Sequence, residues 1–282
     1  ATNDQGQVSP GSGKKLLARA AALGVRYLDT ARSYGEAEEV IGGSGTANKF
    51  RIVTKLLPVG GSKIDAAAVA DLRRAFVDSL ARLRISRVYG LLIHRVGDLA
   101  KPGADQLIAL LEELREAGQV ERIGASVYDA AEIDLIRSRF RPGLVQIPLS
   151  LADQRLIQNG AIAALRGDGI AIHARSIFLQ GLLLAQPGRL PPALMRWDAA
   201  LRGWRARLDE IGMTPLEASL RCALNTPAVE AVIVGVTSPD ELEAIARAAG
   251  LPKRNFDEAR LALDDEELLD PRKWPTPRVA QL

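Results

Sequence analysis

The chain has 282 residues, of which 47% are hydrophobic and 25% charged, and this composition excludes the disordered and collagen-like classes of protein. Its formal charge of +3 is the small difference between 37 basic and 34 acidic residues, so a nucleic-acid-binding function is not indicated. At about 150 residues per domain, a chain of this length would have two domains, but α/β barrels of this length commonly form a single domain.

Short apolar runs alternate with longer amphipathic runs along the chain, and this alternation is typical of repeated βα units. Each short run is apolar without a break, as expected for a strand that is covered on both faces. The runs predicted as strands are 25–29, 51–56, 88–94, 122–126, 144–148, 170–174 and 231–235. The runs predicted as helices are 13–23, 36–42, 65–84, 103–118, 129–139, 155–166, 198–226 (long enough for two helices) and 238–249.

Residues that commonly begin and end helices stand at the limits of these runs. The predicted N-caps are Asp65, Asp129 and Ser238, whose side chains can accept from backbone N–H groups of the first turn. The predicted C-caps are Gly24, Gly118 and Gly250.

An α/β fold of the (β/α)8 TIM barrel type has eight strands, and seven are predicted here, so the first strand is expected to lie before Ala1. In this interpretation residues 1–282 form a single barrel domain with a C-terminal tail from about 251. The gap would leave an unpaired strand edge, which a neighbouring chain can fill. The alternative is an open, doubly wound sheet of seven strands, which is less favoured because no glycine-rich fingerprint follows any predicted strand.

Cysteine and histidine usage argues against a disulfide or a metal site. Cys222 is the single cysteine, and the two histidines lie far apart in sequence without the spacing of zinc ligands. The chain also lacks an apolar run of about 18 residues, which a membrane span requires, and its N-terminal stretch lacks the apolar segment of a signal peptide. We therefore expect a cytoplasmic protein that binds neither metal nor membrane.

Four chemically active side chains stand at or just after the ends of three successive predicted strands. Asp29, Lys55 and His94 lie at strand ends, and Tyr34 follows Asp29 by five residues. Reacting groups of (β/α)8 barrels project from these ends. Each residue alone has an ordinary alternative: Asp29 as a helix cap, Tyr34 as a loop aromatic, Lys55 as a solvated charge and His94 as a hydrogen-bonded core residue. Together they indicate a catalytic site.

Three segments resemble the aldo-keto reductase family in order and spacing: GVRYLDTARSYGEAEEVIG, the strands IVTKL and LLIH, and GQVERIGASVYDAAEI. The resemblance runs from about Gly6 to Gly250, and within the family the chain is most similar to a short-chain bacterial branch. It implies a catalytic tetrad of Asp29, Tyr34, Lys55 and His94.

The mechanism implied by the resemblance is hydride transfer between a nicotinamide ring and a carbonyl carbon, with Tyr34 as the general acid in reduction. An unperturbed tyrosine has a pKa of about 10, so positive charge must favour its phenolate before it can act near neutral pH. By the resemblance, Lys55 supplies this charge, Asp29 orients the lysine, and His94 positions the substrate oxygen.

The resemblance also implies contacts to the nicotinamide cofactor. Ser126 and Gln146 match the groups that hold the carboxamide, although Val127 replaces the usual asparagine. In HARSIFLQGLL, Arg175 replaces a tyrosine that stacks on the ring, and a guanidinium plane can also stack. The candidates for the pyrophosphate side are Ser176, Phe178 and Gln180, with core packing as the alternative for Phe178.

The segment VGVTSPDELEAI resembles the loop and helix that bind the adenosine phosphate. The cofactor-binding candidates there are Gly235, Thr237, Ser238 and Glu241, and Ile245 replaces the adenine-binding asparagine. Asp240 and Glu241 stand where basic or neutral groups would serve a 2′-phosphate. Because carboxylates repel a 2′-phosphate and accept from a ribose hydroxyl, NAD(H) is expected over NADP(H).

The function expected from these residues is an NAD(H)-preferring oxidoreductase that acts on a small aldehyde, ketone or sugar. The alternative is a homologue that binds NAD(H) and regulates another protein, for example in bacterial cell division, with little or no turnover. A protein partner or a homo-oligomer is left open. The substrate is expected to be selected by the loop after Ala174, which contains Pro191, Pro192 and Trp197, and by the tail, where Trp274 is expected to fold over the barrel mouth.

Overall fold

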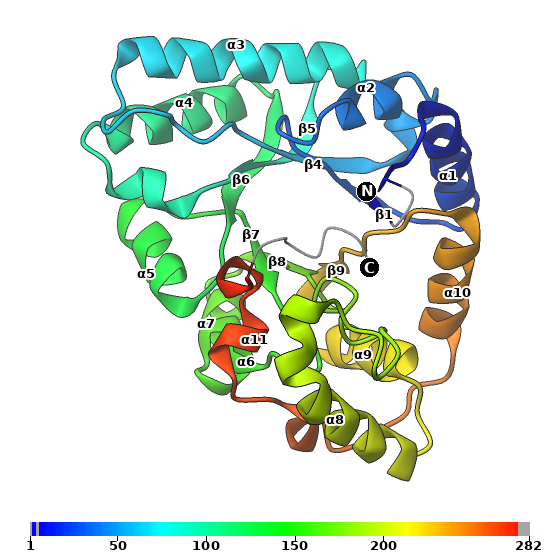
Figure 1. Cartoon of the computed structure of the whole chain (residues 1–282). Coiled ribbons are helices and arrows are strands. Elements are labelled where there is room, and N and C mark those ends of the chain that lie inside the picture. The colour runs from blue at the N-terminus through cyan, green and yellow to red at the C-terminus, as the bar shows by residue number, and fades with distance from the viewer. Residues whose placement is uncertain (1, 4–5, 276–282) are drawn as a thin grey trace. The chain divides into compact units, whose positions relative to one another are not determined.

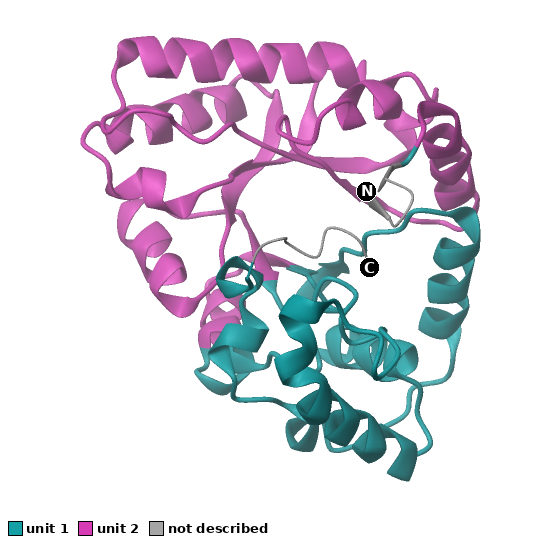
Figure 2. Cartoon of the chain, viewed as in Figure 1, with its two compact units in different colours: residues 1–8, 148–160, 174–282 teal, residues 9–147, 161–173 magenta. Residues whose placement is uncertain are grey.

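A computed structural model describes residues 2–3 and 6–275 of the chain. The chain divides into two compact units (Figure 2): unit 1 comprises 1–8, 148–160 and 174–282, and unit 2 comprises 9–147 and 161–173. The expectation of a single domain over 1–282 stays a prediction.

Parallel strands form the centre of unit 2. They are β3 (Tyr27–Asp29), β4 (Arg51–Lys55), β5 (Val88–Ile93), β6 (Val120–Ser126) and β7 (Leu144–Pro148), and their registers are parallel throughout. Strand β8 (Ala171–Arg175) passes from unit 2 into unit 1, where β9 (Val229–Val232) follows, and Ile233 N donates to Ala174 O at 2.7 Å. In the described residues the sheet order is β3-β4-β5-β6-β7-β8-β9.

This consecutive order is that of a (β/α)8 barrel, and the seven predicted strands are confirmed. The doubly wound alternative is wrong, because such a sheet reverses its strand order at a switch point. Two short strands, β1 (Thr2–Asn3) and β2 (Gly6–Gln7), pair antiparallel with each other. Within the described residues no strand of the parallel sheet precedes β3, and the strand expected before Ala1 lies outside them.

Helices alternate with the strands, and in unit 2 they lie outside the sheet (Figure 1). The helices of unit 2 are α1 (Pro10–Ala22), α2 (Ala37–Gly42), α3 (Ala66–Leu83), α4 (Ala104–Glu116), α5 (Ala130–Arg139) and α7 (Ala161–Gly167). Those of unit 1 are α6 (Arg155–Gln158), α8 (Asp198–Glu210), α9 (Pro215–Asn225), α10 (Pro239–Gly250) and α11 (Glu266–Leu269). The 3-10 turns are η1 (Ala47–Lys49), η2 (Val96–Ala100), η3 (Pro192–Trp197), η4 (Glu258–Leu261) and η5 (Pro271–Lys273). No helix among the described residues is long and apolar enough to cross a membrane.

Most predicted helix ends are confirmed. The side chains of Asp65, Asp129 and Ser238 accept from backbone N–H groups three residues on, at 2.9–3.2 Å. Gly24 and Gly118 follow their helices with φ of 75° and 73°, the left-handed conformation that a glycine adopts without strain.

The structure differs from the prediction at Gly250 and at Gly160, and it decides the expectation left open for 198–226. Gly250 is the last residue of α10 and not its cap, which is Leu251. The long run 198–226 is two helices, because Gly212 has a φ of 61° and Thr214 starts α9 with a capping box. Gly160, with a φ of 78°, likewise divides 155–166 into α6 and α7. A positive φ is incompatible with a continuing helix.

Each unit has its own apolar cluster. Inside the sheet of unit 2, Val53, Tyr89, Leu92 and Leu144 are buried together. The cluster of unit 1 contains Trp197, Trp204 and Trp274. The predicted role of Trp274 at the barrel mouth is untested. Within unit 1 its ring is buried, and its Nε1 donates to Leu268 O at 2.8 Å.

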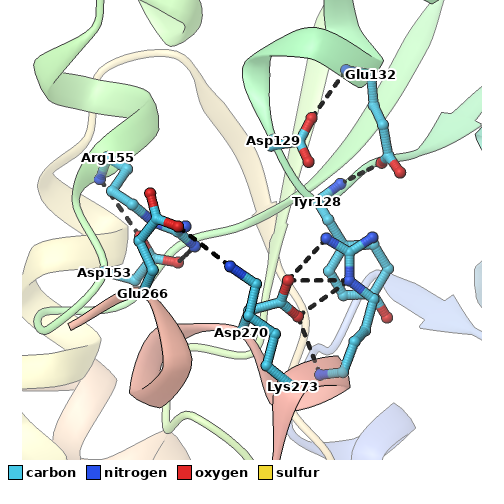
Figure 3. A network of polar contacts seen from close by, with 9 residues as sticks. Tyr128, Asp129, Glu132, Asp153, Arg155, Glu266, Asp270 and Lys273 are labelled. Carbon is cyan, nitrogen blue, oxygen red and sulfur yellow. Dashed lines mark hydrogen bonds and ion pairs between the residues drawn. The ribbon is translucent and has the colours of Figure 1, made fainter.

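Ion pairs lie within the C-terminal tail and in the neighbouring segment 153–155 of unit 1 (Figure 3). Lys273 Nζ lies 3.1 Å from Glu266 Oε2, and Arg272 Nη2 lies 2.8 Å from Asp270 Oδ2. Arg155 Nε lies 2.8 Å from Asp153 Oδ1. The hydrogen bond to Asp153 raises the pKa of Arg155, and the charges of Asp270 and Glu266 raise it further. Hydrogen bonds join the tail to the rest of unit 1, since Leu263 N donates to Ala152 O at 2.9 Å and Gln154 Nε2 donates to Glu258 O at 2.7 Å.

Candidate active site

The carboxyl ends of β3 and β4 bring Asp29 and Lys55 together in unit 2. Lys55 Nζ donates to Asp29 Oδ1 and Oδ2 at 2.8 and 2.6 Å, and to Thr30 O at 3.0 Å. Lys55 is only 2% exposed. A buried ammonium is tolerated only when its charge is paired and its protons are bonded, and these three acceptors meet that need. The pair is therefore fixed in one geometry.

Tyr34 and His94 lie beside this pair. Lys55 Nζ is 5.1 Å from the centroid of the Tyr34 ring, and the rings of Tyr34 and His94 meet edge to face, with centroids 5.9 Å apart. Ser33 Oγ lies 3.5 Å from His94 Nδ1. Tyr34 is 46% exposed, so a molecule at this edge of the sheet can reach its phenol. The structure thus brings all four residues of the predicted tetrad together, while their catalytic roles stay predictions.

Gln146 and Ser126 extend the same network from β7 and β6. Gln146 Nε2 donates to Asp29 Oδ1 at 2.7 Å, and Ser126 Oγ donates to Gln146 Oε1 at 3.4 Å. Both side chains are buried. From the sequence, Ser126 and Gln146 are predicted to bind the carboxamide of the cofactor. The hydrogen bond from Gln146 to Asp29 was not predicted. Gln146 therefore has a role in holding Asp29 as well as its predicted role at a cofactor.

The loop after β8, in unit 1, has an unusual backbone. Ser176, Leu179 and Gln180 have φ of 61°, 48° and 56°, a conformation that costs free energy in residues other than glycine and that clusters at functional sites. Arg175 Nη1 donates to Ser176 Oγ at 3.2 Å. Phe178 is buried, which fits the alternative of core packing.

The N-terminus of α10 carries the candidates for the adenosine phosphate. Ser238 caps the helix by accepting from Glu241 N at 3.2 Å. The Glu241 carboxylate in turn accepts from Thr237 N at 2.7 Å and from Thr237 Oγ1 at 3.0 Å. At Gly235, a Cβ would meet no atom within 4 Å, so local packing does not require glycine there. Glu241 therefore has a structural role that the sequence interpretation missed.

Further polar residues support the cluster in unit 2, and sequence reasoning did not identify them. Thr30 supplies a carbonyl oxygen to Lys55, and Ser33 contacts His94. Glu38 accepts from Thr54. Thr30 and Ser33 flank predicted site residues in the sequence, and that proximity is the signal that could have found them. Within the described residues, no group of three or more histidine, cysteine or acidic residues could hold a metal ion.

The chain belongs to the aldo/keto reductase family, because the model of that family matches residues 1–262. A bacterial relative is the "Uncharacterized oxidoreductase YqkF" of Bacillus subtilis (strain 168). It is 25% identical over 264 residues, which cover 87% of this chain and 84% of YqkF. The resemblance seen in the sequence is thereby confirmed, and an oxidoreductase activity is supported.

Solved structures share the fold. The holo form of aldo-keto reductase AKR11C1 from Bacillus halodurans is similar with a TM-score of 0.75 and 20% identity, over 93% of this chain and 92% of that one. A mutant of Gox0644 in complex with NADPH is similar with a TM-score of 0.67 and 20% identity, over 91% and 87% of the two chains. These similarities establish the barrel fold.

Proposed function

We propose that the chain is an oxidoreductase that uses a nicotinamide cofactor to reduce a small aldehyde, ketone or sugar carbonyl. The observation that carries this proposal is the Asp29–Lys55 ion pair placed against the accessible phenol of Tyr34. A bound reduced nicotinamide supplies the hydride to the carbonyl carbon. The carbonyl oxygen then needs a proton, and Tyr34 donates it.

Lys55 assists this proton transfer by its charge. Asp29, Thr30 O and the buried position hold the ammonium in place. Positive charge beside the phenol stabilises the phenolate that remains after the proton has left. Because the charge is held in place before the reaction, it stabilises this anion with little reorganisation.

His94 positions the carbonyl oxygen. When Ser33 Oγ donates to Nδ1, the ring proton is on Nε2, and Nε2 is then a donor. A carbonyl oxygen that accepts from both Tyr34 and His94 is polarised before hydride arrives. These two donors also stabilise the negative charge that develops on this oxygen.

Each unit by itself carries groups that suit one part of a nicotinamide dinucleotide. In unit 2, Ser126 and Gln146 provide the hydroxyl and amide that a carboxamide needs. In unit 1, the positive end of the helix dipole at the N-terminus of α10 favours a phosphate, as helix N-termini do in many nucleotide sites. We propose NAD(H) as the preferred form because of Asp240 and Glu241. The Gox0644 mutant was solved with NADPH, so both cofactors must be measured.

A cofactor titration followed by a carbonyl panel tests the proposal. NADH and NADPH are titrated by fluorescence, and reduction of small aldehydes, ketones and sugars is then followed by loss of absorbance. We expect binding with a dissociation constant in the micromolar range and turnover of at least one carbonyl class. Binding without turnover on any of them would reject the proposal and favour the NAD(H)-binding regulator. Val127 favours the alternative of a regulator, because it has no side-chain amide at a position where the family has asparagine.

A further inference from the structure

Glu38 is a buried carboxylate behind the candidate active site. It lies in the first turn of α2, four residues after Tyr34, and is 1% exposed. Its Oε1 accepts from Thr54 Oγ1 at 2.9 Å. Its Oε2 is also buried and has no hydrogen-bond partner within the described part of the chain. Glutamate is almost never buried unless it is paired, so this position requires a physical reason.

Thr54 directly precedes Lys55 on β4. Successive side chains of a strand point to opposite faces, so Lys55 meets Asp29 on one face of the sheet while Thr54 meets Glu38 on the other. The Glu38–Thr54 hydrogen bond therefore joins the helix that follows Tyr34 to the strand that carries Lys55.

Tyr34 depends on its backbone for its position, because its side chain is half exposed. Two turn bonds shape this loop: Tyr34 N donates to Ala31 O at 2.9 Å, and Ala37 N donates to Tyr34 O at 3.2 Å. The loop leads into α2, which has six residues and is too short to be stable without tertiary contacts.

The two ends of α2 are held by different contacts. At the C-terminal end, Gly42 packs so closely on the carbonyl of Arg82 that an added Cβ would lie 2.0 Å from it. In the first turn, Glu39 forms an ion pair of 2.7 Å with Arg82 of α3 near the surface. At the N-terminal end, next to Tyr34, the Glu38–Thr54 bond connects α2 to the sheet.

We propose that Glu38 is a positioning residue that, through Thr54, fixes the Tyr34 loop relative to Lys55. Glu38 does not contact the reacting atoms in this role. It sets the separation between the phenol and the ammonium from the outer face of the sheet. The expected change in kcat rests on the proposed function. The expected effect on the Tyr34 loop can be measured without turnover.

The test removes the donor with Thr54→Val, which preserves the shape of the side chain, and restores it with Thr54→Ser. We expect Thr54→Val to lower kcat by about tenfold to a hundredfold, as displacements near 1 Å do, with cofactor affinity unchanged. Thr54→Ser should recover at least a third of kcat. Glu39→Ala is the matched control, because it removes a carboxylate from the same helix without touching β4 and should leave kcat unchanged.

Hydrogen exchange of the peptide spanning residues 30–42 gives a readout that does not require activity. Thr54→Val and Glu38→Ala should speed exchange at Tyr34 and Ala37, whereas Glu39→Ala should leave these two amides slow. If the unmutated protein reduces no carbonyl, the proposed function fails and the exchange contrast still decides the role of Glu38. Unchanged exchange at both amides in a folded Thr54→Val protein, or equal kcat for Thr54→Val and Thr54→Ser, would overturn the positioning role. Should Glu38→Ala fail to fold, the Thr54 pair alone decides.

Discussion

At the scale of single residues, the site separates a buried charge pair from an accessible acid. Lys55 is enclosed and bonded to Asp29, whereas Tyr34 is half exposed. This division suits proton transfer, because the fixed pair provides a charge of constant position and the phenol can reach a substrate. Gln146 adds a third group to the pair by donating to Asp29.

Replacing Tyr34 with phenylalanine tests the general acid. The change removes one hydroxyl and keeps the ring, so the contact with His94 should persist while the proton donor is lost. We expect kcat to fall by about a hundredfold to ten-thousandfold, the range for general acid catalysis, with the dissociation constant of the cofactor nearly unchanged. Steady-state kinetics and fluorescence titration check this. A variant that keeps more than a tenth of the wild-type kcat would contradict the assignment.

The residues of the tetrad could be predicted from the sequence because strand ends are readable. Asp29, Lys55 and His94 each terminate an apolar run, and parallel strands place such ends at one edge. The bond from Gln146 to Asp29 could not be predicted, since it joins residues 117 positions apart. Glu38 was missed because a charged residue in an amphipathic run is normally assigned to the solvent face.

At the scale of elements, the first turn of α10 determines our cofactor prediction. Glu241 both accepts hydrogen bonds from Thr237, just before the helix, and carries the charge that should repel a 2′-phosphate. Glu241→Gln keeps an acceptor for Thr237 and removes the charge, so it separates these two roles. A residual repulsion of about 1.4 kcal/mol corresponds to a tenfold preference for NADH, and the substitution should reduce it. Dissociation constants of both cofactors are the measurement.

Glu243→Gln serves as the control on the same helix, because Glu243 lies 3.6 Å from Arg247 and outside the predicted phosphate site. Its cofactor ratio should match that of the unmutated protein. Equal affinity of the unmutated protein for NADPH and NADH would refute the preference and would direct attention to Arg175 or Arg247 as phosphate ligands.

A buried carboxylate, that of Asp98, joins the loops after β4 and β5. The Asp98 carboxylate is buried and accepts from Val59 N at 2.9 Å, and Lys101 Nζ lies 2.8 Å from it. Arg95 donates to the same carboxylate and to Val59 O. Because these loops follow Lys55 and His94, the network fixes how both strands end.

Asp98→Ala should therefore destabilise unit 2. The substitution leaves the Val59 N–H without its buried acceptor, which costs about 1–3 kcal/mol. Arg95 and Lys101 lose the same acceptor, but their side chains reach solvent and add less to this cost. Urea unfolding gives the free energy of unfolding. Asp105→Ala, which removes an exposed partner of Arg139, should cost less than about 1 kcal/mol. Similar values for the two variants would show that the Asp98 network contributes little.

The order and type of the elements could be predicted better than their limits. Apolar runs gave all seven strands, and capping side chains gave the starts of α3, α5 and α10. The break at Gly160 was missed because a glycine within a helical run is tolerated at moderate cost, whereas the length of the run 198–226 already allowed two helices. Whether such a glycine ends the helix depends on the packing of the flanking segments.

At the scale of the whole molecule, acid should destabilise the fold through carboxyl groups distributed over both units. Among the described residues, the pKa values of five carboxyls are lowered. Hydrogen bonds from Ala68 N, Gly188 N and Leu268 N are the main causes for Asp65, Asp198 and Asp265, and the bond from Arg73 is the main cause for Glu113. Burial alone raises the pKa of Asp270, but the hydrogen bonds and charge of Arg272 outweigh it.

Because these pKa values are lowered on folding, the stability of the fold should decrease at acid pH. A carboxyl whose pKa is lower in the folded than in the unfolded chain stabilises the fold at pH values above the unfolded pKa, and this contribution is lost as pH falls through the folded value. Unfolded carboxyls begin to bind protons as pH approaches about 4. We therefore expect the melting temperature to be nearly constant between pH 8 and pH 6 and to fall steeply below about pH 4.5.

Asp270→Asn isolates one of these groups. At pH 7 the substitution removes the ion pair with Arg272, and each 1 kcal/mol lost should lower the melting temperature by roughly 2–4 °C. At pH 3 the carboxyl of the unfolded chain already binds a proton, so part of the stabilisation by the lowered pKa of Asp270 is lost, and the difference between the variant and the unmutated protein should shrink. Asp264→Asn, at an exposed neighbour, controls for removal of a charge from the same tail. A melting-temperature deficit of Asp270→Asn that is equal at pH 7 and pH 3 would show that its ionisation does not contribute to the acid sensitivity of the fold.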